Sequence, residues 1–448
     1  MPMKLIRIGS GAGYSGDRIS PAVELANQGD LHYLIFECLA ERTVALAQLE
    51  KSKNPDAGFD PLLRDRMKAV LQTCVVKGIK IITNMGAANP ISAAQEVISV
   101  ARELDVRKLK IAVVQGDDVL THVFSHDFHV IETGEPINLI KEAVISANAY
   151  LGVEPIVQAL KMQADIVITG RVSDPALFLA PLIHEFEWPL NDWAMMGKGI
   201  LIGHLLECAG QITGGYFADP GYRDVPNLAT LGFPFAEVSE DGSAIITKVE
   251  GSGGCVTVAT CISQMLYEIG DPSAYFQPDV IADFSNVVFT EVGKDRIRIE
   301  GATGQRRPEM IKVTLGVKDG FVGEGQISYA GEGALARSQL ALEVLRNRLE
   351  VQSSIEFLDI RYDLIGVNSI HGNALSNKSD AYEIRARVAA RVKSRKEAEF
   401  VANEVEAMYL NGPAGGGGAV KSVREVVAAL SVMVPRQMIN TSVTLVEV

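Results

Sequence analysis

Arg171 and His371 stand in short polar stretches whose residue types could carry chemistry. Arg171 follows an apolar run in "ITGRVSDPAL", just before Asp174-Pro175, a pair typical of a helix start. Its guanidinium could hold a substrate carboxylate or phosphate, or form an ion pair with Asp174. His371, in "VNSIHGNALSN", is our first candidate for the general acid or base, with Asn373 beside it as a substrate-binding amide. The alternative for His371 is a structural role in a tight turn.

Carboxyl and amide side chains also follow predicted strands. Asp117 and Asp118 come after "LKIAVVQG" and could act as a base, or hold a divalent metal together with Glu37 and Asp17. Adjacent acids after a strand are more often cap and loop residues, so both interpretations stay open. Asn84, in "TNMGAANP", could orient a substrate through its amide or hold its own loop. Glu37 and Asp117 join Arg171 and His371 as candidate catalytic residues.

A glycine-rich stretch near the start, "GAGYSG" at 11–16, matches G-x-G-x-x-G. In a dinucleotide-binding fingerprint the helix begins within the glycines. Here Ser20-Pro21 predicts a first helix near Pro21, which argues against a bound NAD, although Glu37 has the spacing of a ribose-binding acid. We interpret the stretch as a loop that brings backbone and side chains to a ligand. Its predicted substrate-binding residues are Gly11, Gly13, Asp17 and Arg18.

A second glycine-rich stretch, "NGPAGGGG", follows a predicted helix late in the chain. Gly412 could be a helix cap that leads into a linker. Alternatively, the backbone around Gly415 and Gly416 could bind phosphate or carboxylate, supported by Lys421 and Arg424.

Two different sequence patterns predict the elements that position these residues. Before Gly214, apolar runs alternate with helical patterns, which predicts a mostly parallel sheet with helices on both faces and a ligand site at its carboxyl edge. After Gly214, pairs such as Asp241-Gly242 and Asp319-Gly320 predict hairpins in an α+β domain with largely antiparallel strands. We therefore expect an α/β ligand-binding domain at 1–213 and an α+β domain at 214–448.

The charge balance excludes some partners. Lys and Arg number 42 against 55 Asp and Glu, for a net charge of −13, and no basic block stands out. This argues against nucleic acid and anionic membranes, and an anionic small molecule would have to meet local Arg, Lys or helix N-termini. Five Cys without a C-x-x-C pair favour a reducing compartment, and we expect a cytoplasmic protein.

Several stretches in order along the chain resemble one family. They are "IRIGSGAGYSGDR", "FECLAERT", "ITNMGAANP", "GDDV", "ITGRVSDPAL", "GGYFADPGYRDVPNL", "GFPFAEVSEDG", "VNSIHG" and "NGPAGGGG". Together they are similar to the acyclic terpene utilisation family, named for bacterial growth on citronellol and geraniol. The resemblance implies a catabolic pathway of branched acyl-CoA thioesters, with a cleavage role on a 3-hydroxy-3-methylglutaryl-like thioester. Some relatives carry an extra small C-terminal domain, so a separate small partner protein is compatible with the resemblance.

From these observations we expect a cytosolic lyase or hydratase that acts on a branched acyl-CoA thioester or a small polycarboxylate. CoA would enter as part of the substrate, a divalent metal is left open, and a homo-oligomer is expected. Arg171 would grip an anionic group in the same cleft as His371. Two alternatives stay open: a non-catalytic thioester-binding subunit that needs a partner chain, and an NAD-linked oxidoreductase.

Overall fold

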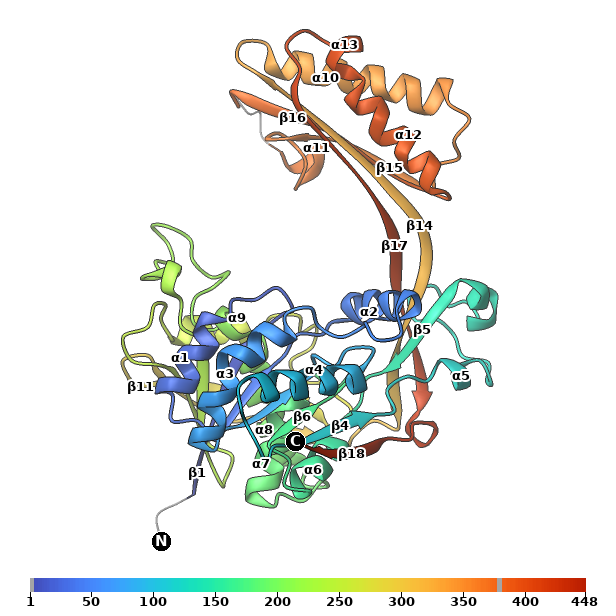
Figure 1. Cartoon of the computed structure of the whole chain (residues 1–448). Coiled ribbons are helices and arrows are strands. Elements are labelled where there is room, and N and C mark those ends of the chain that lie inside the picture. Colours follow the sequence, from blue (N-terminus) through green and yellow to red (C-terminus); the bar gives the residue numbers. More distant parts are fainter. Residues whose placement is uncertain (1–3, 377–380) are drawn as a thin grey trace. The chain divides into compact units, whose positions relative to one another are not determined.

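The computed structural model describes residues 4–376 and 381–448 (Figure 1). The chain divides into two compact units. The first contains Met1–Gly316 and returns with Ala429–Val448; the second is Val317–Ala428. Over the described ranges, every helix is too short or too polar to cross a membrane.

A ten-stranded sheet forms the centre of the first unit. Its middle is parallel because each of these strands is followed by a helix that returns the chain to the same end. In spatial order the parallel strands are β1 (Leu5–Ala12), β2 (Tyr33–Phe36), β3 (Lys80–Thr83), β6 (Ile166–Ile168) and β4 (Lys110–Gln115). Antiparallel strands extend both edges: β7 (Pro234–Ser239), β8 (Ala244–Lys248), β12 (Arg296–Glu300) and β11 (Val288–Gly293) beyond β1, and β18 (Ser442–Glu447) beyond β4.

Helices cover both faces of this sheet. Leu34 and Phe36 of β2 belong to one apolar core with residues of α1 (Ser20–Gln28), α3 (Leu63–Lys77) and α4 (Pro90–Glu103). The neighbouring Tyr33 points to the opposite face, where its hydroxyl donates to Glu185 of α7 (Ala176–Phe186) at 2.6 Å. Also in this unit are α2 (Glu41–Lys53), α5 (Leu120–Val123), α6 (Glu154–Lys161) and α8 (Trp193–Glu207).

Smaller elements complete the first unit. A three-stranded sheet contains β13 (Thr303–Gln305), β10 (Ile281–Asp283) and β9 (Tyr275–Phe276). The helix α9 (Val258–Met265) precedes it, and β5 (Val144–Ala149) pairs with β14 (Met310–Ala330).

The second unit is built on four strands of a five-stranded sheet, whose fifth strand is β5, and helices cover these four strands. Its order is β15 (Asp359–Ile365), β16 (Glu383–Val392), β14 and β17 (Gly417–Pro435), and β16 is antiparallel to both of its neighbours. Alternate residues of β16 are buried in a core with α10 (Ala334–Arg346) and α12 (Arg395–Glu406), which lie along the same face of the sheet (Figure 1). Two short helices, α11 (Gly372–Leu375) and α13 (Met408–Asn411), connect these elements.

The expected fold class is confirmed, but the compact units differ from the division expected near Gly214. The four strands β7, β8, β12 and β11 follow Gly214 and yet continue the first unit's sheet, with Ala236 of β7 opposite Ile8 of β1. A hairpin signal identifies which strands are neighbours along the chain, whereas the edge that a hairpin joins is set by tertiary packing.

Candidate functional site

A cavity of about 580 Å³ lies in the first unit, next to the loops at the carboxyl ends of β1 and β2. Five acidic side chains and one cationic side chain line it: Glu37, Glu41, Asp174, Glu207, Glu268 and Lys312. Rings and apolar side chains form further parts of the wall, among them Tyr150, Tyr267, Tyr275, Phe276, Met310, Ile311 and Met433. The position matches the sheet edge where open α/β sheets bind ligands.

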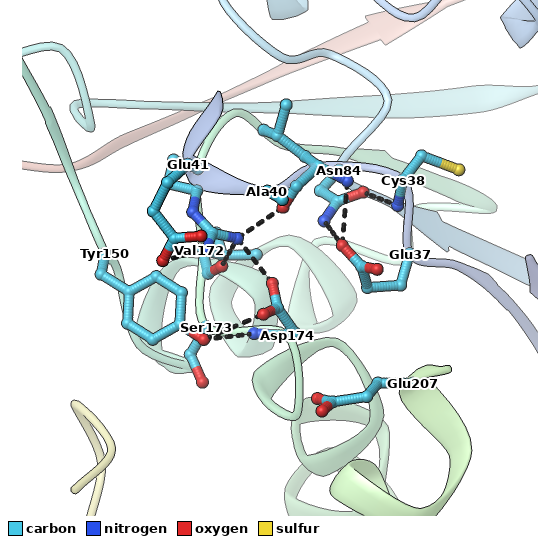
Figure 2. Close-up of polar contacts among 12 residues, drawn as sticks. Glu37, Cys38, Ala40, Glu41, Asn84, Tyr150, Val172, Ser173, Asp174 and Glu207 are labelled. Carbon is cyan, nitrogen blue, oxygen red and sulfur yellow. Dashed lines mark hydrogen bonds and ion pairs between the residues drawn. The ribbon is translucent and has the colours of Figure 1, made fainter. Parts of the chain in front are cut away.

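Arg171 is buried in the turn between β6 and α7, behind this wall. Nη1 donates to Leu39 O and Asp174 Oδ1, both at 2.6 Å, and Nη2 donates to Glu41 Oε1 at 3.3 Å (Figure 2). The guanidinium carbon lies 4.5 Å from the centre of the Tyr150 ring. Of the two interpretations of this arginine, the ion pair with Asp174 is therefore present, and Arg171 joins two acidic residues of the cavity wall.

Asp174 and Tyr150 form a reciprocal pair at the cavity (Figure 2). The Tyr150 hydroxyl donates to Asp174 Oδ2 at 3.1 Å and accepts from the Asp174 backbone N–H at 3.2 Å. Burial raises the pKa of Asp174, while the charge and hydrogen bond of Arg171 oppose that rise. The carboxyl group is thus held on both oxygens.

Glu37 follows β2 and is held by an amide from the neighbouring strand. Its Oε1 accepts from Asn84 Nδ2 at 2.8 Å and from the Leu39 backbone N–H at 2.9 Å, while Asn84 Oδ1 accepts from Cys38 N at 2.7 Å (Figure 2). Across the described part of the chain, Oε2 of Glu37 has no hydrogen-bond partner. Burial, reinforced by the negative charge of Asp174, raises the pKa of Glu37 well above its usual value. The surroundings of this carboxyl group therefore favour its protonated form more than water does.

Glu207 is a cavity residue that the sequence analysis did not select. It ends α8, and its Oε1 pairs with His204 Nδ1 at 3.0 Å. Burial raises the pKa of Glu207 to about 7, because the charge of His204 only partly offsets it. A histidine and a glutamate three residues apart in a largely apolar helix are the signal that could have identified this pair.

The first glycine-rich stretch has the predicted helix start, since α1 begins at Ser20 with Pro21 in its first turn. Gly11 still belongs to β1, where a Cβ would lie 2.6 Å from the Phe36 ring. At Gly13 a Cβ would lie 2.5 Å from the Cys208 carbonyl carbon, so glycine is required for this close approach.

The loop after Gly13 faces a second cavity of about 540 Å³, whose lining includes Gly13, Asp17 and Arg18. Asp17 Oδ2 accepts from the Gly13 N–H at 3.0 Å, and Oδ1 accepts from the Arg18 N–H at 2.8 Å. The Arg18 side chain donates to the Ala229 carbonyl at 3.2 Å. Asp17 therefore fixes the loop, and Arg18 joins it to the segment near Ala229.

Asp117 is buried behind the cavity wall. Its Oδ2 accepts from Asn148 Nδ2 at 2.8 Å and from the Arg171 backbone N–H at 3.0 Å. Burial raises the pKa of Asp117 to about 6, against the lowering effect of these two hydrogen bonds. Within residues 4–376 and 381–448, no group of three or more His, Cys, Asp or Glu side chains could hold a metal ion.

The remaining predicted site residues belong to the second unit. His371 is exposed directly before α11, and Asn373 accepts from Asn368 Nδ2 at 2.6 Å. Gly415 has a φ of +75°, which favours glycine, and a Cβ on Gly416 would lie 3.0 Å from Ile327 Cδ1. The substrate-binding and catalytic roles of these residues stay predictions, as does a common cleft for Arg171 and His371.

Comparison with known proteins gives one match. A family model described as "Acyclic terpene utilisation family protein AtuA" matches residues 6–445. No curated protein and no solved structure matches the chain. The matched range contains every residue that lines the two cavities.

Proposed function

The chain belongs to the acyclic terpene utilisation family, and from this premise we propose that it is an acid–base enzyme of the lyase or hydratase class. Its substrate is a branched acyl-CoA thioester, whose acyl end enters the cavity beside Glu37. The observation that carries the proposal is the carboxyl group of the cavity residue Glu37, which has a raised pKa, a fixed orientation and an Oε2 without a hydrogen-bond partner among the described residues.

Addition or removal of water, or cleavage of a carbon–carbon bond next to a carbonyl group, requires a proton to be placed and withdrawn at defined atoms. A carboxyl group with a pKa near the working pH serves either role. Asn84 and the Leu39 N–H hold Glu37 through Oε1 alone, so Oε2 can meet the reacting atom. Asp174 adds negative charge nearby and favours the protonated form of Glu37.

The charges of the cavity support an uncharged acyl group over a small polycarboxylate. Five acidic side chains line it against Lys312 alone, and the guanidinium of Arg171 is already engaged by Asp174 and Glu41. A carboxylate on the acyl group of a substrate would be repelled by the acidic side chains of the cavity. The rings of Tyr275 and Phe276, with Met310 and Met433, offer apolar surface to a branched acyl chain.

The test is turnover by the purified chain and its Glu37→Gln variant on a panel of branched enoyl-CoA and 3-hydroxyacyl-CoA thioesters, with products identified by mass spectrometry. The glutamine can accept the same hydrogen bonds at Oε1 but cannot transfer a proton. We expect kcat to fall by about 10² to 10⁴ with little change in KM. Glu50→Gln, an exposed residue of α2, is the matched control and should keep normal kinetics.

Full activity of Glu37→Gln would contradict the proposal. Thioester binding without turnover by the wild type would favour the non-catalytic subunit, and reduction of added NAD would favour the oxidoreductase.

A further inference from the structure

The second candidate proton-transfer group at the cavity is the pair formed by Glu207 and His204 on α8. The two residues are three positions apart, so they share one face of the helix. Both are buried, and His204 Nδ1 lies 3.0 Å from Glu207 Oε1. The other ring nitrogen, Nε2, lies 3.2 Å from the Met265 backbone carbonyl.

The Met265 carbonyl limits the protonation states of this pair. A carbonyl oxygen only accepts, so Nε2 of His204 carries a proton. Nδ1 then has two options. It accepts a hydrogen bond from a protonated Glu207, or, as part of an imidazolium, it donates one to a Glu207 carboxylate. The two states differ by the transfer of one proton between Nδ1 and Oε1.

The other carboxyl oxygen of Glu207 has an unusual position. Oε2 is buried and has no hydrogen-bond partner among the residues that the structure describes, and Glu207 is part of the cavity lining. A buried polar atom without a partner is rare in native proteins and calls for a specific explanation. A ligand group that donates a proton to Oε2 would satisfy it.

From this geometry we infer that Glu207 is a second catalytic group of the cavity, a base whose Oε2 takes a proton from the bound ligand, and that His204 is the positioning residue that keeps this base anionic. The inference rests on the proposed function and adds a base to the acid supplied by Glu37.

The proton step balances within the pair and the ligand. A ligand X–H bond breaks at Oε2, the proton forms an O–H bond with Glu207, and the electron pair stays on X. His204 remains an imidazolium that donates through Nδ1 to Oε1. The O–H bond of Glu37 breaks, its proton forms an O–H bond with the ligand oxygen that takes up the electron density, and Glu37 is left as a carboxylate. Two carboxyl groups in opposite protonation states are the arrangement that acid–base chemistry requires.

The surroundings explain why His204 is needed. Asp174 and Glu268 add negative charge that, together with burial, favours a protonated Glu207, and the imidazolium counters both. Burial by itself lowers the pKa of His204, but Glu207 and the Met265 carbonyl raise this pKa above the usual value. The rings of Tyr275 and Phe284 pack beside the imidazole at 5.3 and 6.2 Å, and Gln264 donates to the His204 carbonyl at 3.0 Å. These contacts hold the ring in place.

The test combines a spectroscopic arm and a kinetic arm. In protein labelled with ¹⁵N-histidine, NMR titration follows the His204 ring nitrogens between pH 5 and 9. Glu207→Gln should lower the pKa of His204 by about one pH unit or more, since it removes the partner charge. Glu268→Gln removes a nearby charge without a hydrogen bond and should lower it by less. Binding of isovaleryl-CoA should shift the His204 ring signals in the wild type and not in Glu207→Gln.

In the kinetic arm, Glu207→Gln should lower kcat about 10²- to 10⁴-fold. His204→Asn should move the acidic limb of the pH–rate profile to higher pH, because Glu207 then protonates more readily. A purely structural role would lower the rate equally at every pH. A His204 titration that Glu207→Gln leaves unchanged, or an unmoved limb in His204→Asn, overturns the inference. Loss of activity in Glu37→Gln with full activity in Glu207→Gln overturns it while leaving the proposed function standing.

Discussion

Removal of the Arg171 side chain should destabilise the first unit strongly. In Arg171→Ala the Asp174 carboxyl loses its partner at 2.6 Å, Glu41 keeps only Lys312, and the Leu39 carbonyl loses a donor. Removing one partner of a buried ion pair costs about 3–5 kcal/mol. The lost packing of the guanidinium on Tyr150 adds about 1–2 kcal/mol. We therefore expect the free energy of unfolding to fall by about 4 kcal/mol or more at pH 7.

The loss should depend on pH with a defined sign. Burial raises the pKa of Glu41, but Arg171 and Lys312 bring it down to about 2. A carboxyl group with a lowered pKa in the folded state contributes stability above its unfolded pKa, near 4.5, and this contribution disappears as the pH falls toward 2. The wild type therefore loses part of this advantage between pH 4.5 and 2. The part of the difference in unfolding free energy between wild type and Arg171→Ala that comes from Glu41 should therefore become smaller as the pH falls through this interval.

Urea unfolding followed by tryptophan fluorescence measures this effect directly. Both tryptophans, Trp188 and Trp193, belong to the first unit, so the signal reports on the unit that contains Arg171. Arg107→Ala is the matched control, because Arg107 pairs with Asp105 on the surface and both side chains are about four-fifths exposed. The free energy of unfolding of Arg107→Ala should fall by less than about 0.5–1 kcal/mol. A loss below about 1.5 kcal/mol for Arg171→Ala at pH 7 would refute the reasoning, since a buried charge pair of this geometry costs more to break.

Three further predictions concern residues selected from the sequence. Asp117→Asn can keep both hydrogen bonds through one oxygen, and it removes a carboxyl group with a pKa of about 6. A raised carboxyl pKa costs the wild type stability as the pH rises from about 4 through 6. In urea titrations between pH 4.5 and 8, the free energy of unfolding of the variant should therefore exceed that of the wild type by about 1–3 kcal/mol. Gly13→Ala should lower the melting temperature and weaken thioester binding in calorimetry, because the added Cβ meets the Cys208 backbone. Gly16→Ala should be tolerated, because the Cβ added there meets the exposed Tyr14 ring, and equal effects of the two substitutions would contradict this account. His371→Ala should leave the melting temperature unchanged because the residue is exposed, yet lower turnover by about 10² to 10⁴ if His371 is a general acid or base, and unaltered kinetics would remove it from the site.

Much of the first unit's architecture follows from local sequence patterns. Apolar runs such as "HYLIFEC" and "IKIITNMG" predict strands buried on both faces, and the helical patterns between them imply parallel pairing. Ser20-Pro21 predicts the start of α1, because proline fixes a backbone angle that suits the first turn of a helix. These signals act over a few residues, so the sequence alone carries them.

Tertiary structure decided what the candidate residues contact. The sequence places Arg171 at a strand end, but its partner Glu41 and the Leu39 carbonyl are supplied by the segment after β2, about 130 positions earlier. Likewise, β7 joins the first sheet by pairing with β1, and β8, β12 and β11 extend the sheet from there. Local patterns do not encode which distant segment approaches.

The same reason explains Glu207. In the sequence it is one acid at the end of a largely apolar helix. Its raised pKa comes from burial and from the negative charges of Asp174 and Glu268, against the lowering effect of His204. Desolvation and Coulomb interactions depend on distances in space. The acidic residues Asp174, Glu207 and Glu268 come from different parts of the chain and meet only at this cavity. The sequence alone determined which side chains carry groups that can transfer protons, and only the folded chain decided which of them share a cavity and in which direction their surroundings shift their pKa values.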